Sequence, residues 1–357
     1  MEKSFKKMKV LVSALAAVLV LICAMLLMTG TAHAATKYQL ASGFMTSGQY
    51  RADFGQNGNE RTALAGGYYW TEWGGSPAAS KLYHSKTEDG AGTLIGKTVN
   101  TDSLIRNLDL RILTNGSKVY YTVESTKTRT WQEGSKTGIY CGSVNGSKAK
   151  LVKTITQKAG NGKLQLVSVY GGKLYYRVNY SVYGDYARRT PLYSLDLKTK
   201  KVKKVSGDFD SSYTYNSGGD RYLYGASFGK DGLRIFDCKK DKFIRTISTA
   251  SAQGSAIDGG RLYYLVTNGE KDYTKIYSAS RSGADRKPVL EGLPYNTWVD
   301  VISKDYICYR INDGLDGHIY MTATGEDRKL DQMAYQNYIK ENPHGANIYT
   351  GSGVLRG

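Results

Sequence analysis

The stretches "GGKLYYRV" at Gly171–Val178 and "GGRLYYLV" at Gly259–Val266 are nearly the same phrase, written twice in one chain. In each, a glycine turn is followed by two adjacent aromatic residues and a short apolar run, which is the pattern of a β-strand entered from a tight hairpin. The phrase returns in looser form along the whole chain. Its six copies begin at Gly66, Gly116, Gly171, Gly218, Gly259 and Ser303.

Each copy is followed by a second short strand that contains an aromatic residue. These aromatic residues are Tyr83, Tyr140, Tyr193, Phe236, Tyr277 and Tyr320, spaced by 57, 53, 43, 41 and 43 residues. A repeat of this length that carries several short strands and almost no helical periodicity is typical of a β-propeller blade. The sequence therefore predicts an all-β fold, a six-bladed β-propeller. A seventh blade split between the termini is the alternative.

The third repeat shows the expected strands most clearly. They are "LQLVSVY" as the inner strand, "KLYYRVNY" as the second, "PLYSLDL" as the third and "KVKKV" as the outer strand. Adjacent tyrosines point to opposite faces of a strand, so stacked blades would bury both. We therefore interpret the 30 tyrosines of the chain as structural first.

The repeat units lie approximately at residues 66–100, 101–157, 158–206, 207–248, 249–292 and 293–331. We expect a single propeller domain over 35–357. The segments "KYQLASGF" and "GQYRADF" before the first unit and "NIYTGSGVLRG" after the last could pair to close the ring, which would protect exposed strand edges.

The motif "YYWTEWGG" at Tyr68–Gly75 resembles the YWTD motif of low-density-lipoprotein-receptor-type propellers, with Glu72 where that family has Asp. "KIYSASRSGADRKPVLEG" at Lys275–Gly292 is similar to the continuation of that motif. The resemblance covers roughly Gly66 to Leu330 and implies six blades. Exported bacterial proteins of uncharacterised function also look like this.

The first 34 residues are typical of a secretory signal peptide. Four lysines precede an apolar run from Val10 to Met28, and Ala32 and Ala34 stand in the spacing of a cleavage site after Ala34. An uncleaved anchor is the alternative, because the run approaches the ~20 residues that span a bilayer. We expect a protein that is secreted, or associated with the cell surface or cell wall, without a stable membrane span after processing.

The net charge indicates the kind of partner, and the cysteines indicate whether disulfides or a metal site are present. The whole chain carries a net charge of +18, and since residues 1–34 hold four lysines and one glutamate, +15 remains on 35–357. Such a charge favours anionic partners, although a solvated lysine-rich surface explains it as well. Cys141, Cys238 and Cys308 are odd in number and far apart, so neither a disulfide scaffold nor a metal site is expected. We expect no cofactor.

The connections between the second and third strands are long and aromatic in the first three repeats. We expect them to form a ligand-binding surface on one face. Its candidate residues are Trp73, Arg129, Trp131, Tyr183, Tyr186 and Arg188, with Arg189 beside them and Trp298 joining from another loop. Exposed aromatic and arginine side chains stack sugar rings or anchor proteins. Folding of the tryptophans into the loops, or of Trp298 into the core, is the structural alternative.

The sequence shows no nucleophile elbow, zinc-protease motif or phosphate-binding loop. The main prediction is therefore a non-enzymatic, monomeric binding or scaffolding module for an extracellular protein, glycan or anionic wall polymer. Dispersed basic residues without a known module argue against nucleic acid. The alternative is a carbohydrate-active enzyme, a glycosidase or lyase, with an acidic pocket on the axis to which Asp208 and Asp210 would contribute.

Overall fold

The structure, a computed structural model, divides the chain into two compact units, Met1–Lys37 and Tyr38–Gly357. All residues that it describes lie in the second unit, so the predicted signal peptide is outside them. The described residues are 39–45, 61–73, 80–97, 109–125, 135–146, 149–157, 164–178, 191–205, 214–217, 221–226, 232–247, 251–268, 273–294, 297–311, 316–342 and 346–347.

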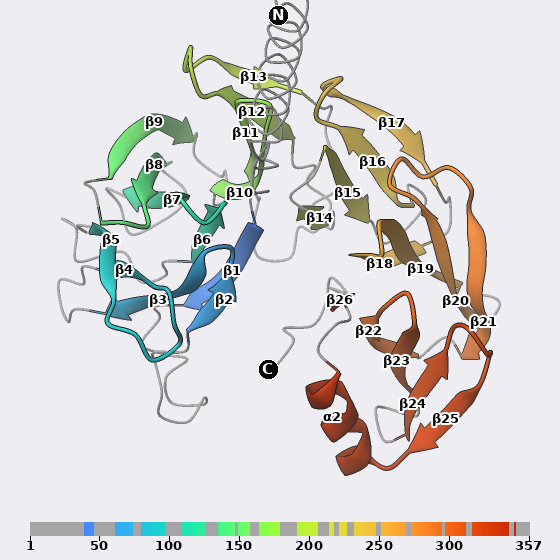
Figure 1. Ribbon diagram of the computed structural model, residues 1–357. Helices are drawn as coiled ribbons and strands as arrows, with labels where there is room; N and C mark the ends of the chain where they lie inside the picture. The colour runs from blue at the N-terminus through green and yellow to red at the C-terminus, as the bar shows by residue number, and fades with distance from the viewer. Residues whose placement is uncertain are drawn as a thin grey trace, which may run out of the picture. The chain divides into compact units, whose positions relative to one another are not determined.

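Six antiparallel sheets follow one another in chain order (Figure 1). The first contains β2 (Thr62–Leu64), β3 (Gly67–Trp73), β4 (Ser80–Ser85) and β5 (Thr93–Lys97). The second contains β6 (Asp109–Thr114), β7 (Lys118–Ser125), β8 (Ser135–Ser143) and β9 (Lys150–Gln157), and the third β10 (Leu164–Tyr170), β11 (Lys173–Val178), β12 (Leu192–Asp196) and β13 (Val202–Lys204).

The remaining sheets repeat this order. The fourth contains β14 (Thr214–Ser217), β15 (Tyr222–Ala226), β16 (Arg234–Asp237) and β17 (Lys242–Thr246). The fifth contains β18 (Ser251–Asp258), β19 (Arg261–Asn268), β20 (Tyr273–Ser280) and β21 (Lys287–Pro294), and the sixth β22 (Trp298–Ile302), β23 (Tyr306–Ile311), β24 (Asp316–Met321) and β25 (Asp327–Leu330). The all-β prediction is confirmed, and the first sheet begins at Thr62, four residues before the predicted repeat boundary.

The adjacent aromatic residues of each repeat bind a sheet to both of its neighbours. In the third sheet, Tyr176 packs into an apolar layer shared with the second sheet, while Tyr175 packs against the fourth. Tyr176 also stacks on Tyr193 of the next strand, with 5.3 Å between ring centroids. Similar apolar layers join the first sheet to the second, the fourth to the fifth and the fifth to the sixth. The two neighbouring aromatic residues of the repeat thus serve to bury both faces of a sheet.

The hydroxyl of the forward-facing tyrosine then joins its sheet to the next one. Tyr69 hydrogen-bonds Thr114 Oγ1 of the second sheet at 2.9 Å, and Tyr224 donates to the Arg281 carbonyl of the fifth sheet at 2.8 Å. Tyr175 donates to the Cys238 carbonyl and to Asp241 Oδ1, both at 2.9 Å. A buried ring therefore carries a satisfied polar tip, which is what tyrosine offers and phenylalanine does not.

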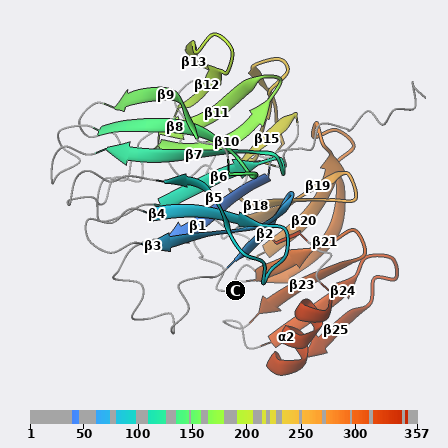
Figure 2. The ribbon, with the colours of Figure 1, turned by 60° about the vertical axis from the view of Figure 1, so that its left-hand side comes forward.

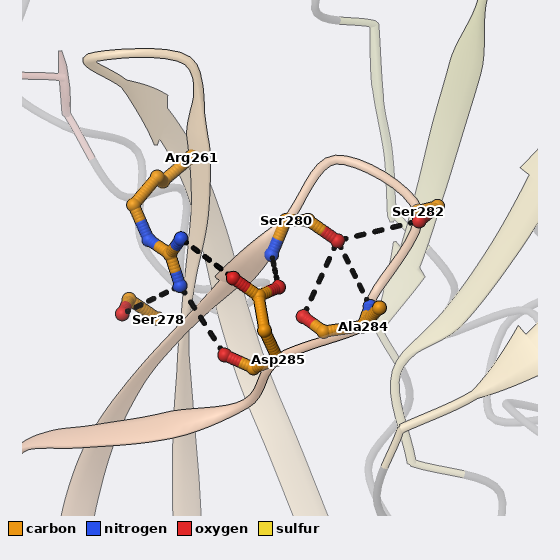
Figure 3. A network of polar contacts seen from close by, with 6 residues as sticks. All are labelled: Arg261, Ser278, Ser280, Ser282, Ala284 and Asp285. Atoms are coloured by element: carbon orange, nitrogen blue, oxygen red, sulfur yellow. Dashed lines mark hydrogen bonds and ion pairs between the residues drawn. The ribbon is translucent and has the colours of Figure 1, made fainter.

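The turns contain residue types that suit their backbone conformation, such as glycine where φ is positive. Gly171 and Gly172 have φ of 56° and 76°, so the hairpin predicted between β10 and β11 is confirmed. Figure 3 shows the turn between β20 and β21, where Asp285 accepts hydrogen bonds from the Ser280 backbone N–H at 2.8 Å and from Arg261 at 2.9 Å. This network fixes the turn that receives the Tyr224 hydroxyl.

The end of the chain contains a helix that the sequence pattern did not predict. Helix α2 (Gln332–Glu341) begins after Asp331, whose side chain accepts a hydrogen bond from the Ala334 backbone N–H at 2.8 Å. It packs on the face of the sixth sheet that is turned away from the fifth, beside β24 and β25 (Figure 2). There it takes the position that a following sheet occupies elsewhere, and Tyr306, a residue of the repeat pattern, donates its hydroxyl to the Asn342 carbonyl at 2.5 Å.

Of the three segments predicted to close the ring, "GQYRADF" lies outside the described residues, and the strands that overlap the other two pair with different sheets. Strand β1 (Gln39–Met45) adds to β6 of the second sheet, and β26 (Ala346–Asn347) adds to β22 of the sixth. Each lies on the inner side of a first strand. In this part of the chain, the terminal strands thus extend two separate sheets and do not pair with each other.

Candidate functional site

Most of the predicted binding residues lie outside the described residues. These are Arg129, Trp131, Tyr183, Tyr186, Arg188 and Arg189, together with the acidic pair Asp208 and Asp210. Trp73 is the last residue of β3, and its side chain is not described. Trp298 is the one predicted residue whose side chain can be placed. Whether the predicted residues form one surface therefore stays a prediction, since Trp298 alone of them has a described side chain.

Trp298 begins β22, the first strand of the sixth sheet, and its side chain is 47% exposed. It is not a core residue, although its neighbour Val299 is buried against the fifth sheet. The preceding Thr297 is buried, and its Oγ1 has no hydrogen-bond partner among the described residues. Buried hydroxyl groups normally hydrogen-bond to protein, water or ligand.

An ion pair lies next to Trp298 on the same sheet. Arg310 of β23 stands opposite Trp298 in the strand register. Its Nε donates to Asp300 Oδ2 at 2.6 Å and its Nη2 to Asp300 Oδ1 at 2.8 Å. The hydrogen bond to Asp300 is the main cause that raises the pKa of Arg310. Such a two-pronged contact fixes both side chains in orientation.

Tyr335 of α2 also contacts Asp300. Its ring is buried, and its hydroxyl donates to Asp300 Oδ2 at 2.8 Å. Burial, followed by the charge of Asp300, raises the pKa of Tyr335, so the hydroxyl stays protonated and keeps donating. Oδ2 thus accepts two hydrogen bonds, while Oδ1 accepts one among the described residues. Oδ1 is the oxygen with remaining acceptor capacity.

Trp298, Asp300, Arg310 and Tyr335, here called the Trp298 cluster, combine an exposed aromatic face with a fixed carboxylate and guanidinium. The sequence analysis missed the last three. One signal was present, because Arg177 in "YYRV" and Arg310 in "CYRI" hold the same place in the repeat. Arg177 likewise binds the first strand of its sheet, donating to Gln165 at 2.8 Å. The arrangement can hold a polar ring: the tryptophan packs on its face, and charged groups meet its hydroxyl or carboxylate substituents.

Other kinds of site find little support in the described part of the chain. No group of three or more His, Cys, Asp or Glu side chains is placed there to hold a metal ion. No helix among these residues has the length and apolar character to cross a membrane. Cys238 and Cys308 are buried free thiols, and burial raises the pKa of Cys308 to about 12. Buried thiols of this kind are unreactive and pack as small apolar side chains.

No family model and no curated protein matches this chain. Among solved structures, it is similar to the β-propeller domain of the Trilobed protease from Pyrococcus furiosus, with 14% identity, 75% of this chain and 78% of that one covered, and a TM-score of 0.44. An uncharacterized protein from Listeria monocytogenes shares 9% identity over 77% of this chain and 84% of its own, with a TM-score of 0.47.

A third similar structure is acylaminoacyl peptidase from Pyrococcus horikoshii, with 10% identity, 77% of this chain and 44% of that chain covered, and a TM-score of 0.46. Prolyl endopeptidases and an oligogalacturonate lyase are also similar. The expectation of a purely non-catalytic binding or scaffolding module was therefore wrong, because these neighbours are mostly enzymes. At such identities the likeness concerns the fold alone, so any activity of this chain must be argued from its own residues.

Proposed function

We propose that this chain is a carbohydrate-active enzyme, a glycosidase or lyase, which binds a sugar chain at the Trp298 cluster. The observation that carries the proposal is the exposed Trp298 ring in register with Arg310, whose partner carboxylate, Asp300, is also held by Tyr335. Aromatic faces pack on sugar rings, and a few fixed polar groups set the orientation of a ligand. Asp300 Oδ1 and Arg310, whose side chain is 31% exposed, are the groups suited to bind sugar substituents.

The reacting groups would come from the connection between β13 and β14. Asp208 and Asp210 belong to this connection, which leads from the outer strand of one sheet to the first strand of the next. The connection from β21 to β22 contains Thr297 and leads directly to Trp298. Both connections therefore hold the same place in the repeat, between an outer strand and the first strand of the next sheet. A carboxylate pair there would act as general acid and base.

This proposal includes the wider architecture. The six sheets would be the blades of a six-bladed propeller with low-density-lipoprotein-receptor-type repeats, supported by the four-strand order that recurs in each. The apolar run after the basic N-terminus, followed by Ala32 and Ala34, supports export with cleavage after Ala34. The substrate would then be an extracellular or wall glycan.

The test is an activity screen of residues 35–357 against a panel of neutral and acidic polysaccharides. Products would be read as new reducing ends for a hydrolase or as unsaturated sugars for a lyase. We expect Trp298→Ala to raise KM about tenfold or more with a smaller change in kcat, and Asp208→Asn with Asp210→Asn to lower kcat by about 10²–10⁴-fold.

Met333→Ala is the matched control, because Met333 is an exposed large side chain, 74% accessible, on α2 near the cluster. It should leave both kinetic constants unchanged. A wild-type protein that cleaves no polysaccharide in the panel, or a Trp298→Ala variant with wild-type KM, would contradict the proposal.

A further inference from the structure

The turns between the third and fourth strands of the third and fourth sheets carry a dense group of lysines. Residues 196–204 and 237–245 hold nine basic and three acidic side chains. Within these two turns and their outer strands, the exposed basic residues are Lys198, Lys200, Lys201, Lys203, Lys204, Lys239, Lys240, Lys242 and Arg245. We call this surface the lysine turns.

The two turns are built alike. Asp196 accepts hydrogen bonds from the backbone N–H groups of Lys198 and Thr199 at 3.0 and 2.6 Å. Asp237 accepts from those of Lys239 and Lys240 at 2.9 and 3.3 Å. Each turn then passes through a residue with positive φ, Lys200 at 60° and Asp241 at 51°. The same backbone therefore presents lysines at equivalent places in both sheets.

Two of the three acidic residues of the lysine turns face inward, and all three are already engaged. Asp237 is fully buried and forms an ion pair with Arg221. Asp241 forms an ion pair with Lys173 of β11 and accepts from the Tyr175 hydroxyl. Hydrogen bonds from Thr199 are the leading cause that lowers the pKa of Asp196, so this carboxylate serves its own turn. Asp237 and Asp241 are thus paired with other side chains, and Asp196 is a single half-exposed carboxylate in a turn and strand with five exposed lysines.

Contacts between the sheets also fix the two turns relative to each other. The Lys173–Asp241 ion pair and the Tyr175 hydrogen bonds attach the turn of the fourth sheet to the third sheet. The lysines therefore belong to one continuous surface on neighbouring sheets. Such a surface focuses a positive potential and attracts extended anions.

We propose that the lysine turns bind a linear phosphate-bearing polymer. Lysine is a compact point charge that pairs well with phosphate, whereas planar arginine suits the two-pronged recognition of carboxylates. Eight of the nine basic residues of this surface are lysines. Their placement on two equivalent turns fits a ligand that repeats its charge along its length. This site is separate in the sequence from the Trp298 cluster and does not depend on the enzymatic proposal.

The experiment measures binding of residues 35–357 to fluorescently labelled inorganic polyphosphate across a series of salt concentrations. We expect tight binding at low salt and a steep linear fall of log K with log salt, as for polyanions that release counterions. The triple variant Lys198→Gln, Lys239→Gln, Lys242→Gln should bind about tenfold or more weakly at low salt and show a shallower slope, because three phosphate contacts are lost.

The matched control is Lys86→Gln, Lys150→Gln, Lys340→Gln, which removes the same charge from exposed lysines on the first sheet, the second sheet and α2. It should retain most of the affinity and the slope. Equal losses in the two triple variants would overturn the proposal, since net charge alone would then explain binding. So would binding to phosphatidylglycerol vesicles without binding to polyphosphate. Circular dichroism of both variants checks that these surface changes leave the fold intact.

Discussion

At the scale of single residues, the tyrosine hydroxyls have the clearest structural role. A tyrosine of the repeat buries its ring between two sheets and extends its hydroxyl to a backbone or carboxylate acceptor in the next sheet. A buried acceptor that loses its donor costs free energy, because water cannot replace the bond. Hence the repeat uses tyrosine where an apolar ring would fill the same volume.

Tyr175→Phe tests this role directly. We expect the variant to lose about 1–2 kcal/mol in the free energy of unfolding, since the Cys238 carbonyl and Asp241 both lose a buried donor. Tyr320→Phe is the control, because the Tyr320 hydroxyl makes no hydrogen bond with any described residue. It should change stability by less than about 0.5 kcal/mol. Denaturant unfolding measures both, and similar values for the two variants would contradict the role of the hydroxyl.

At the scale of elements, the local sequence of α2 gives only weak support for a helix. Its ten residues, "QMAYQNYIKE", bury one side chain fully, Tyr335. A helix this short is marginal by itself, so docking on the sixth sheet must supply much of its stability. Gly317 of β24 makes room for that docking, because a Cβ there would lie 2.5 Å from Tyr335 Cγ.

Gly317→Ala should therefore destabilise the protein by about 1–3 kcal/mol through the clash with the Tyr335 ring. The same change in a Tyr335→Ala background should cost less, because the two nearest atoms, Tyr335 Cγ at 2.5 Å and Cδ2 at 2.7 Å from the new Cβ, are gone. Thermal unfolding of the wild type, both single variants and the double variant forms a complete cycle. Additive effects would show that Gly317 does not accommodate Tyr335.

Local pattern was enough to predict the strands and not enough to predict this helix or the Trp298 cluster. All four strands of the third sheet were predicted to within two residues at each end, since glycine turns and alternating apolar residues are local signals. The Asp300–Arg310 pair depends on strand register and on a bulge between Val299 and Val301. Its contact with Tyr335 depends on a helix 35 residues away in the sequence. Such contacts are set by tertiary structure.

At the scale of the whole second unit, each sheet is covered on one face by the element that follows it in the chain. The forward face of each of the first five sheets packs against the following sheet, and that of the sixth against α2. Cys238 lies between the third and fourth sheets, whereas Cys308 lies under α2. The reactivity of Cys238 therefore measures how well two sheets stay packed, and the reactivity of Cys308 measures how well α2 stays docked.

Undocking α2 should make Cys308 reactive and leave Cys238 protected. Burial raises the pKa of Cys308 to about 12, so its thiolate is scarce in the native protein. Tyr335→Ala with Tyr338→Ala removes the rings that hold the helix, and solvent should return the Cys308 pKa toward its ordinary ~8.5. Since the thiolate is the reactive form, labelling by iodoacetamide at pH 8 should accelerate at least tenfold at Cys308, as measured by peptide mass spectrometry.

Cys238 is the internal control, because the two sheets that bury it are unchanged in this variant. If both thiols accelerate together, the variant has loosened the whole array of sheets; if Cys308 reacts as fast in the wild type, α2 does not cover it.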